Sequence, residues 1–236
     1  MQYVEKTIDV IILAGGFGTR IQSVSKNVPK SLLPVGNRFF LDYVLEWLSK
    51  YRIKRVVLSL HYKCEEFLSY LEQHQFPFEV VPIIEPEPMG TGGAVKYVID
   101  RIRLSEPFGV TNGDSYLDFD ISGMYKDFIS KKSSAMIGLS FTDDAYRYGT
   151  VSYDDSTMLA LSFREKLNSQ SGWINNGFYL FGNRAFNSFD SKFSIEKDFF
   201  PELILQEELF VYPTKGEFLD IGVPEEYKKF IKKFSR

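Results

Sequence analysis

The segment IDVIILAGGFGTRIQSVSKNVPK (residues 8–30) joins an apolar run to closely spaced glycines and basic side chains. The apolar part, residues 8–14, is typical of a strand that is buried on both faces of a parallel sheet. Glycines directly after such a strand let the backbone turn tightly and bring amide N–H groups close to an anion. Arg20 and Lys30 add the positive charge that a phosphate chain would need. The alternative is a plain strand-to-helix turn with two solvated cations.

The glycine pattern of this loop excludes two common nucleotide-binding interpretations. It matches neither G-x-G-x-x-G nor G-x-x-x-x-G-K-[ST], so neither a dinucleotide fingerprint nor a P-loop is present as written.

Strand-like and helix-like segments alternate through the first half of the chain. Apolar runs predict further strands at 53–60, 78–84 and 107–114, and helical spacing predicts helices at 39–51, 64–74 and 93–102. This order implies right-handed βαβ units, and therefore a Rossmann-like α/β fold with a mostly parallel sheet and helices on both faces. Ligands of such sheets bind beyond the carboxyl ends of the strands.

The second half changes character. Four short apolar segments predict strands at 134–141, 148–154, 159–163 and 173–181, which we interpret as a smaller antiparallel extension. Helices are expected at 196–206, where Pro201 requires a bend or break, and at 224–234, where Pro224 suits the first turn. We expect one domain over residues 1–236, since no segment has the composition of a linker.

Composition excludes several classes of protein. The net charge of −3 argues against a nucleic-acid-binding surface. A single cysteine rules out an intrachain disulfide and a Cys-rich zinc site, and two histidines are too few for a histidine-based metal site. No stretch reaches the ~20 apolar residues of a membrane helix, and the N-terminus lacks the basic region of a signal peptide. We therefore expect a cytoplasmic protein without membrane or nucleic-acid partners.

Two acidic residues follow apolar runs at distant points of the chain. Asp114 follows Asn112 and Gly113 at the end of a predicted strand, and Asp220 stands in the similar setting FLDIGVP. Carboxylates at strand ends suit Mg²⁺, although an isolated aspartate is more often a helix cap or turn residue. Two glycine loops, two cations and two strand-end acids together indicate a site for a phosphate chain and a magnesium ion.

Two other polar or glycine-rich stretches are candidates for ligand contact. MGTGGA (residues 89–94) could let a flat ring lie against bare backbone, or could simply begin a helix. Asn175 and Asn176 interrupt an apolar strand, where polar groups are costly unless they are paired. Sugar hydroxyls or neighbouring loops could supply their partners.

Seven motifs in order resemble the sugar-1-phosphate nucleotidyltransferases: LAGGFGTR…VPKSLLPV, EPMGTGGAV, NGDSY, FREK, INNGFYLF, EKDFFP and DIGVPEEY. They span residues 10 to about 227. Within that family the sequence is most similar to the D-glycero-D-manno-heptose 1-phosphate guanylyltransferases of bacterial surface-polysaccharide synthesis, such as those of capsule and lipopolysaccharide. The resemblance implies transfer of a nucleotidyl group, GMP from GTP, to a sugar 1-phosphate with release of pyrophosphate.

The resemblance also assigns roles to residues. Those implied in nucleotide binding are Leu13, Ala14, Gly15, Gly16, Gly18, Thr19, Glu85, Gly90, Thr91 and Gly92. Arg20 and Lys30 would neutralise the reacting phosphates, and Asp114 and Asp220 would hold Mg²⁺. Asn112, Gly113, Glu165, Lys166 and Asn176 would face the sugar phosphate. Residues 1–130 would form the nucleotide-binding half, and residues 131–236 the sugar-phosphate-binding half.

Some choices stay open at this point. Leu167 stands where many members have a proline, and either Glu85 or Glu87 could border the base. Other expected activities are the synthesis of GDP-mannose or of a UDP- or dTDP-sugar, and a sensor of the same fold would bind sugar nucleotides without turning them over. The apolar second half leaves room for a homodimer interface.

Overall fold

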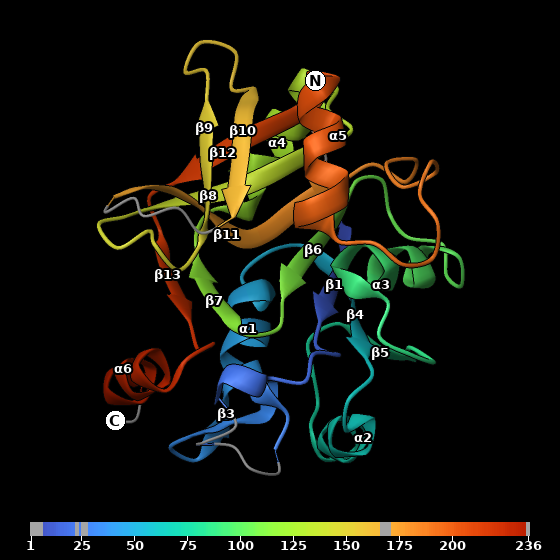
Figure 1. The fold of residues 1–236 in the computed structure, drawn as a ribbon. Helices are drawn as coiled ribbons and strands as arrows, with labels where there is room; N and C mark the ends of the chain where they lie inside the picture. Colours follow the sequence, from blue (N-terminus) through green and yellow to red (C-terminus); the bar gives the residue numbers. More distant parts are fainter. Residues whose placement is uncertain (1–6, 22–23, 25–27, 166–170, 235–236) are drawn as a thin grey trace.

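Four parallel strands form the part of the main sheet that carries the glycine loop. The computed structural model describes residues 7–21, 24, 28–165 and 171–234. Within it the sheet has the order β10-β9-β11-β6-β1-β4-β5 (Figure 1). Its parallel strands are β1 (Ile8–Leu13), β4 (Ile53–Leu60), β5 (Glu79–Ile84) and β6 (Phe108–Asn112). Their carboxyl ends lie at one edge of the sheet, as the alternating pattern predicts.

The second half of the chain continues this sheet. Its strands are β8 (Ala135–Thr142), β9 (Gly149–Tyr153), β10 (Ala160–Glu165), β11 (Gly172–Phe181) and β12 (Leu209–Thr214). Strand β11 is antiparallel to β6, β8 and β9, and β12 is parallel to β8. The predicted α/β fold with an antiparallel extension is therefore confirmed, and β11 joins the extension directly to the parallel strands.

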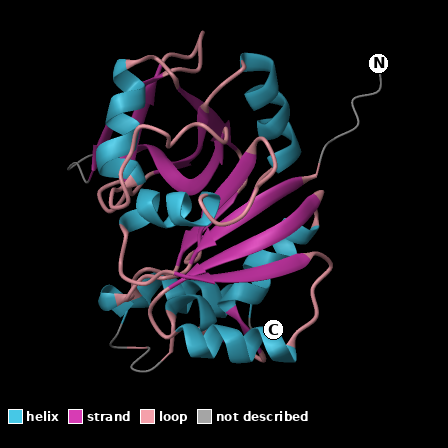
Figure 2. Cartoon of the chain, turned by 90° about the vertical axis from the view of Figure 1, so that its right-hand side faces the viewer, coloured by secondary structure: helices cyan, strands magenta, loops and turns pink. Residues whose placement is uncertain are grey.

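Helices cover both faces of the sheet (Figure 2). Helices α1 (Phe40–Ser49), α2 (Cys64–Gln73), α4 (Ile121–Lys131) and α6 (Pro224–Phe234) contribute to one buried apolar cluster. Helices α3 (Gly90–Ile99) and α5 (Phe200–Leu205) contribute to the other. Successive residues of a strand point to opposite faces. Accordingly, Val10 and Ile12 belong to the first cluster and Ile11 to the second.

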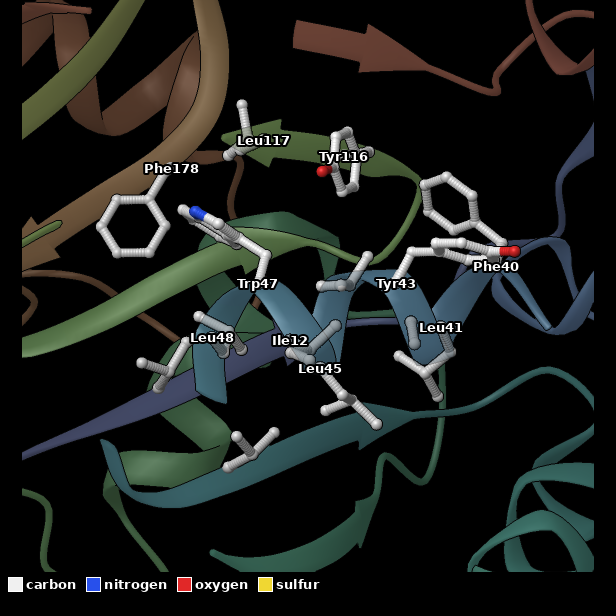
Figure 3. Packing of buried hydrophobic residues seen from close by; sticks show 14 of the residues in the cluster. Ile12, Phe40, Leu41, Tyr43, Leu45, Trp47, Leu48, Tyr116, Leu117 and Phe178 are labelled. Atoms are coloured by element: carbon white, nitrogen blue, oxygen red, sulfur yellow. The ribbon is translucent and has the colours of Figure 1, made fainter. Parts of the chain in front are cut away.

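Helix α1 forms the centre of the first cluster (Figure 3). Its Trp47 is almost fully buried, and the indole ring lies against the rings of Phe119 and Phe178. From helix α6, the ring of Phe230 packs on Phe40 at a centroid distance of 4.9 Å. The last helix of the chain is therefore held on the first one by aromatic packing.

Helix α4 and several short strands were not predicted from the sequence. They are α4, β12, β2 (Pro34–Val35), β3 (Arg38–Phe39), β7 (Ser115–Asp118) and β13 (Glu217–Asp220). Strands β7 and β13 pair antiparallel as a separate small sheet, with Asp220 opposite Ser115. This pairing matters for the site because it brings two distant segments to the edge where β6 ends.

Two helices begin differently from the prediction. Helix α3 starts at Gly90 rather than at residue 93, so the glycines of MGTGGA form its first turn. The predicted helix 196–206 is divided into a π-helical turn, Ile195–Phe199, and the short α5. Pro201 is the second residue of α5, directly after the π-helical turn, so the irregularity expected from this proline lies at the change of helix type.

The packing of Phe230 yields a stability prediction. The Phe230→Ala variant should lose about 3–5 kcal/mol of unfolding free energy, because it leaves a cavity among Phe40, Tyr43 and Tyr116. Urea denaturation followed by circular dichroism measures this loss. Lys228→Ala, on the exposed side of the same helix, is the control and should change stability by less than ~0.5 kcal/mol. Equal losses in both variants would contradict the packing role.

Candidate functional site

Two adjoining cavities lie at the carboxyl ends of the parallel strands. The smaller one, about 170 Å³, is called the basic cavity here and is lined by Leu13, Ala14, Gly16, Gly18, Thr19, Arg20, Lys30, Ser31, Gly113, Asp114 and Gly222. The larger one, about 360 Å³, is called the acidic cavity and is lined by Leu13, Gly15, Gly16, Phe17, Glu85, Pro88, Met89, Gly90, Thr91, Ala94, Asn112, Asp114 and Glu196. The two cavities adjoin, since Leu13, Gly16 and Asp114 line both.

Backbone hydrogen bonds fix the loop that separates the cavities. The amide of Ala14 donates to the carbonyl of Ser59 at 2.9 Å, and the amide of Gly113 donates to the carbonyl of Leu13 at 2.9 Å. Gly18 has φ +59°, a conformation that favours glycine. The loop therefore leaves the strand along one defined path, with Thr19 and Arg20 in a short 3₁₀ turn above the basic cavity.

Lys30 lies between the two predicted acidic residues. Its Nζ atom forms an ion pair with Asp114 Oδ2 and lies 3.7 Å from Asp220 Oδ1. Only 11% of the Lys30 side chain is exposed. The amide of Gly222 donates to Asp220 Oδ1 at 2.6 Å. A Cβ at Gly222 would lie 2.8 Å from that oxygen and 3.0 Å from the lysine nitrogen, so a side chain at this position would displace the ends of Asp220 and Lys30.

The two carboxyl groups have opposite pKa shifts. Burial by itself would raise the pKa of Asp114, but Lys30 and then Arg20 outweigh it and hold that pKa below its usual range. Burial and the negative charge of Asp114 raise the pKa of Asp220, and Lys30 offsets only part of this. One ammonium group therefore does not fully compensate two carboxylates, and the cluster favours a further cation.

The donor set of this cluster fits a magnesium ion. Asp114 and Asp220 both direct a carboxylate oxygen toward the same cation, the ammonium group of Lys30. Within the described residues, no group of three or more His, Cys, Asp or Glu side chains that could hold a metal ion occurs. Two carboxylates suffice for Mg²⁺, because this ion usually keeps several waters and takes substrate phosphates as further ligands.

Glu85 is the acidic side chain at the β5 end of the acidic cavity. Its Oε1 atom accepts a hydrogen bond from Ser59 Oγ at 2.8 Å, and 6% of the residue is exposed. Burial raises the pKa of Glu85, while the Ser59 hydroxyl and the Met89 amide offset part of the effect. Glu87 instead pairs with Lys192 at 2.7 Å, with more than half of its side chain exposed, and does not line this cavity.

The glycines at the start of α3 have a packing role that the sequence did not reveal. The amides of Gly92 and Gly93 both donate to the carbonyl of Phe193 at 3.1 Å. A Cβ at Gly92 would overlap the ring of Phe193. Gly92 therefore packs against another loop and does not line the acidic cavity, whereas Gly90 and Thr91 do.

Three residues predicted to face a sugar phosphate are not placed on either cavity. Asn176 is fully buried; its Oδ1 accepts from the Phe178 amide at 3.1 Å and its Nδ2 donates to Ser140 Oγ at 3.4 Å. Protein groups therefore pair Asn176, as in the alternative left open, although these partners lie in strands β11 and β8 and not in neighbouring loops. Glu165 ends β10, but its side chain, like the whole of Lys166, lies outside the described residues.

Two cavity residues were missed by the sequence analysis. Phe17 lies within the glycine loop, 48% exposed, with its ring 5.2 Å from that of Tyr62. Glu196 lies in the π-helical turn and lines the acidic cavity far from Glu85 in the sequence. An aromatic residue among glycines and an acid inside EKDFFP were the only signals, and neither has a fixed chemical meaning without the fold.

The glycine packing yields a second stability prediction. Gly92→Ala should lower the unfolding free energy by about 1–3 kcal/mol, because the added methyl group overlaps Phe193 and forces the loop to shift. Gly16→Ala is the matched control: a Cβ there meets nothing within 4 Å, so stability should hardly change. Guanidinium unfolding measures the stability of both variants. A Gly92→Ala protein as stable as the control would contradict the close packing of Gly92 on Phe193.

Known proteins are similar to this chain over nearly its whole length. The family model described as nucleotidyl transferase matches residues 9–235. A D-glycero-alpha-D-manno-heptose 1-phosphate guanylyltransferase of Campylobacter jejuni is 36% identical over 226 residues, which covers 95% of this chain and 99% of that protein. A protein of the same name from Aneurinibacillus thermoaerophilus is also 36% identical, over 94% of this chain and 96% of its own length.

A solved structure agrees with these relatives. The crystal structure of HddC from Yersinia pseudotuberculosis superposes with a TM-score of 0.85 at 37% identity, and covers 97% of this chain and 100% of its own. A second structure of HddC, complexed with GMP-PN, has a TM-score of 0.83 at 36% identity, with the same coverage. Among the residues that the structure describes here, no helix has both the length and the apolar character needed to span a bilayer.

Proposed function

The chain belongs to the nucleotidyl transferase family, and on this premise we propose that it transfers GMP from GTP to D-glycero-D-manno-heptose 1-phosphate. As a class the protein is a sugar-1-phosphate nucleotidyltransferase. The observation that carries the proposal is the ion cluster beside the basic cavity, in which Lys30 lies between Asp114 and Asp220. The products are GDP-heptose and pyrophosphate, and GDP-heptose would serve the synthesis of a surface polysaccharide.

The proposed reaction needs no protein nucleophile. A phosphate oxygen of the sugar 1-phosphate attacks the α-phosphorus of GTP and forms the new P–O bond. The bond from the α-phosphorus to the bridging oxygen breaks, and pyrophosphate leaves with the electron pair. Because both reactants are anions, the protein must position them in line and neutralise their charge.

Residues of the basic cavity fit this task. The glycine loop presents backbone amides to the triphosphate, and Arg20 stands at the edge of the same cavity for the leaving pyrophosphate. Lys30, almost buried in the lining of the basic cavity and paired with Asp114, would stabilise the negative charge that develops on the α-phosphate. The larger acidic cavity then holds the nucleoside and the sugar.

Asp114 and Asp220 would hold the magnesium ion of this reaction. When bound, Mg²⁺ neutralises charge on the triphosphate and fixes its position. Before the substrates arrive, Lys30 would hold both carboxylates in place, and the Gly222 amide would hold that of Asp220.

Two observations support guanine as the base. The relatives named above are guanylyltransferases, and the HddC structure with GMP-PN covers 97% of this chain. The acidic cavity also carries carboxylate oxygens, Glu85 among them, which accept hydrogen bonds from N–H donors. Guanine presents such donors on its pairing edge, whereas adenine lacks the ring N–H.

The choice of substrates is tested by a matrix of activities. Purified protein with Mg²⁺ should release pyrophosphate fastest with GTP and D-glycero-α-D-manno-heptose 1-phosphate, and more slowly with mannose 1-phosphate or with UTP, dTTP and ATP. Chelating the divalent cation should abolish turnover, and added Mg²⁺ should restore it. A protein that binds GTP but releases no pyrophosphate with any pair would be a sensor instead.

The role of Lys30 yields the next prediction. Lys30→Ala should lower kcat by about 100-fold or more, because the developing charge on the α-phosphate loses its main partner among the side chains. Lys215→Ala, an exposed lysine in the loop before β13, is the matched control and should keep wild-type turnover. A melting curve checks that Lys30→Ala is folded, and comparable turnover in the two variants would exclude the proposed role.

A further inference from the structure

Glu196 is a carboxylate in the acidic cavity that the reaction described above does not use. It lies in the π-helical turn Ile195–Phe199, half-buried, and lines the cavity together with Thr91 and Asn112. Glu85 lines the same cavity from the loop after β5. The cavity that would receive the nucleoside and the sugar therefore presents acidic side chains from two segments that are distant in the sequence.

Hydroxyl groups from three segments orient this carboxylate. Glu196 Oε2 accepts hydrogen bonds from Thr91 Oγ1 at 2.7 Å and from Ser194 Oγ at 2.8 Å. Glu196 Oε1 accepts a longer one, 3.4 Å, from the hydroxyl of Tyr179. That hydroxyl accepts in turn from Asn175 Nδ2 at 2.8 Å, and Tyr179 itself is fully buried. Helix α3, the π-helical turn and strand β11 thus fix the direction of the Glu196 side chain.

The three hydroxyls leave part of the carboxylate free to bind a ligand. An ionised carboxylate accepts about four hydrogen bonds, and Oε1 has the single long one from Tyr179. The remaining lone pair belongs to a side chain that lines the cavity. Thr91 has no donor left, because its Oγ1 donates to Glu196, and one of its two lone pairs already accepts from the Ile195 amide at 2.9 Å. Of these two residues, Glu196 is the charged one and therefore the stronger hydrogen-bond acceptor for a ligand.

The negative charge of the Glu196 carboxylate restricts which part of a substrate can bind next to it in the acidic cavity. The substrates of the proposed reaction are phosphate anions, and a carboxylate repels them unless the part of the substrate next to it donates hydrogen bonds. Ring hydroxyls are neutral donors, and their hydrogen bonds to an ionised acceptor are stronger than those to a neutral one. Glu196 therefore suits a ribose or pyranose ring and not a phosphate.

We propose that Glu196 accepts a hydrogen bond from a ring hydroxyl of the bound substrate, either of the ribose of GTP or of the sugar of the sugar 1-phosphate, and so helps to determine which substrate is used. This inference rests on the proposed function, which supplies both rings. Tyr179 and Asn175 act on the substrate only through Glu196, so they are positioning residues.

The test compares Glu196→Gln with wild type in steady-state kinetics for both substrates. Glutamine keeps the size of the side chain and one oxygen for Thr91 and Ser194, but it removes the charge that strengthens the hydroxyl contact. KM for one substrate should rise about tenfold, while kcat changes by less than ~3-fold. Glu202→Gln is the matched control: it removes the same charge from helix α5, whose Glu202 lines a different cavity, and should leave both KM values unchanged.

Deoxy substrates identify the ring that is contacted. If KM for GTP rises, 2′-deoxy-GTP and 3′-deoxy-GTP are assayed; if KM for the sugar 1-phosphate rises, deoxy sugar 1-phosphates are assayed. Removing the contacted hydroxyl should weaken binding of the substrate to wild type about tenfold. In Glu196→Gln the same removal should weaken binding little further, because the substitution has already removed that hydrogen bond. Independent, multiplicative losses for every deoxy substrate would overturn the inference.

A merely structural role gives a different result. In that case Glu196→Gln and Tyr179→Phe would both lower the melting temperature, and neither would shift KM for one substrate alone. That outcome overturns the inference while wild-type turnover leaves the proposed function standing. If wild type shows no turnover with any pair of substrates, the proposed function fails. The role of Glu196 is then tested by calorimetry, in which GTP or the sugar 1-phosphate should bind about tenfold more weakly to Glu196→Gln than to wild type.

Discussion

The ammonium group of Lys30, held between the carboxylates of Asp114 and Asp220, is the interaction on which the rest of the site depends. Two carboxylates this close repel each other, and burial strengthens the repulsion because water screens it less. The ammonium group between them offsets this repulsion, and Arg20 adds a weaker positive contribution to both carboxylates. On the proposed function, the negative charge that Lys30 leaves uncompensated at Asp220 would favour a metal ion and, with it, a nucleoside triphosphate.

The fold brings these three side chains together by ordinary packing. Asp114 follows β6 in the middle of the sheet, and Asp220 ends β13, which is aligned by its pairing with β7. The segment after β13 continues into α6, and Phe230 of α6 packs on α1. An apolar contact near the end of the chain therefore helps to place a charged residue of the site. Stability and function share this part of the molecule, although different residues serve them.

At the acidic cavity, too, some residues serve packing and others line the site. The glycines in and beside it serve two purposes: Gly15 lines the cavity and makes room for Glu85 and His61, whereas Gly92 and Gly93 lie outside the lining and make room for the loop around Phe193. That loop leads directly to Glu196, so close packing between α3 and the loop also determines where this cavity-lining carboxylate lies. A substitution at a glycine that touches no ligand would thus disturb binding through its neighbours.

The sequence alone determined the α/β order of elements and most of the charged site, because strand periodicity and strand-end glycines are local signals. Arg20, Lys30 and Asp114 could be named from their neighbours in the chain, whereas Glu85 was implied only by the family resemblance; the structure places all four on the two cavities. Only the tertiary structure decided that Glu85 and not Glu87 lines the acidic cavity, that Asn176 bonds to protein, and that Glu196 faces the cavity. Those outcomes depend on which side chains the packing of distant segments buries, pairs or leaves open, and no local pattern contains that information.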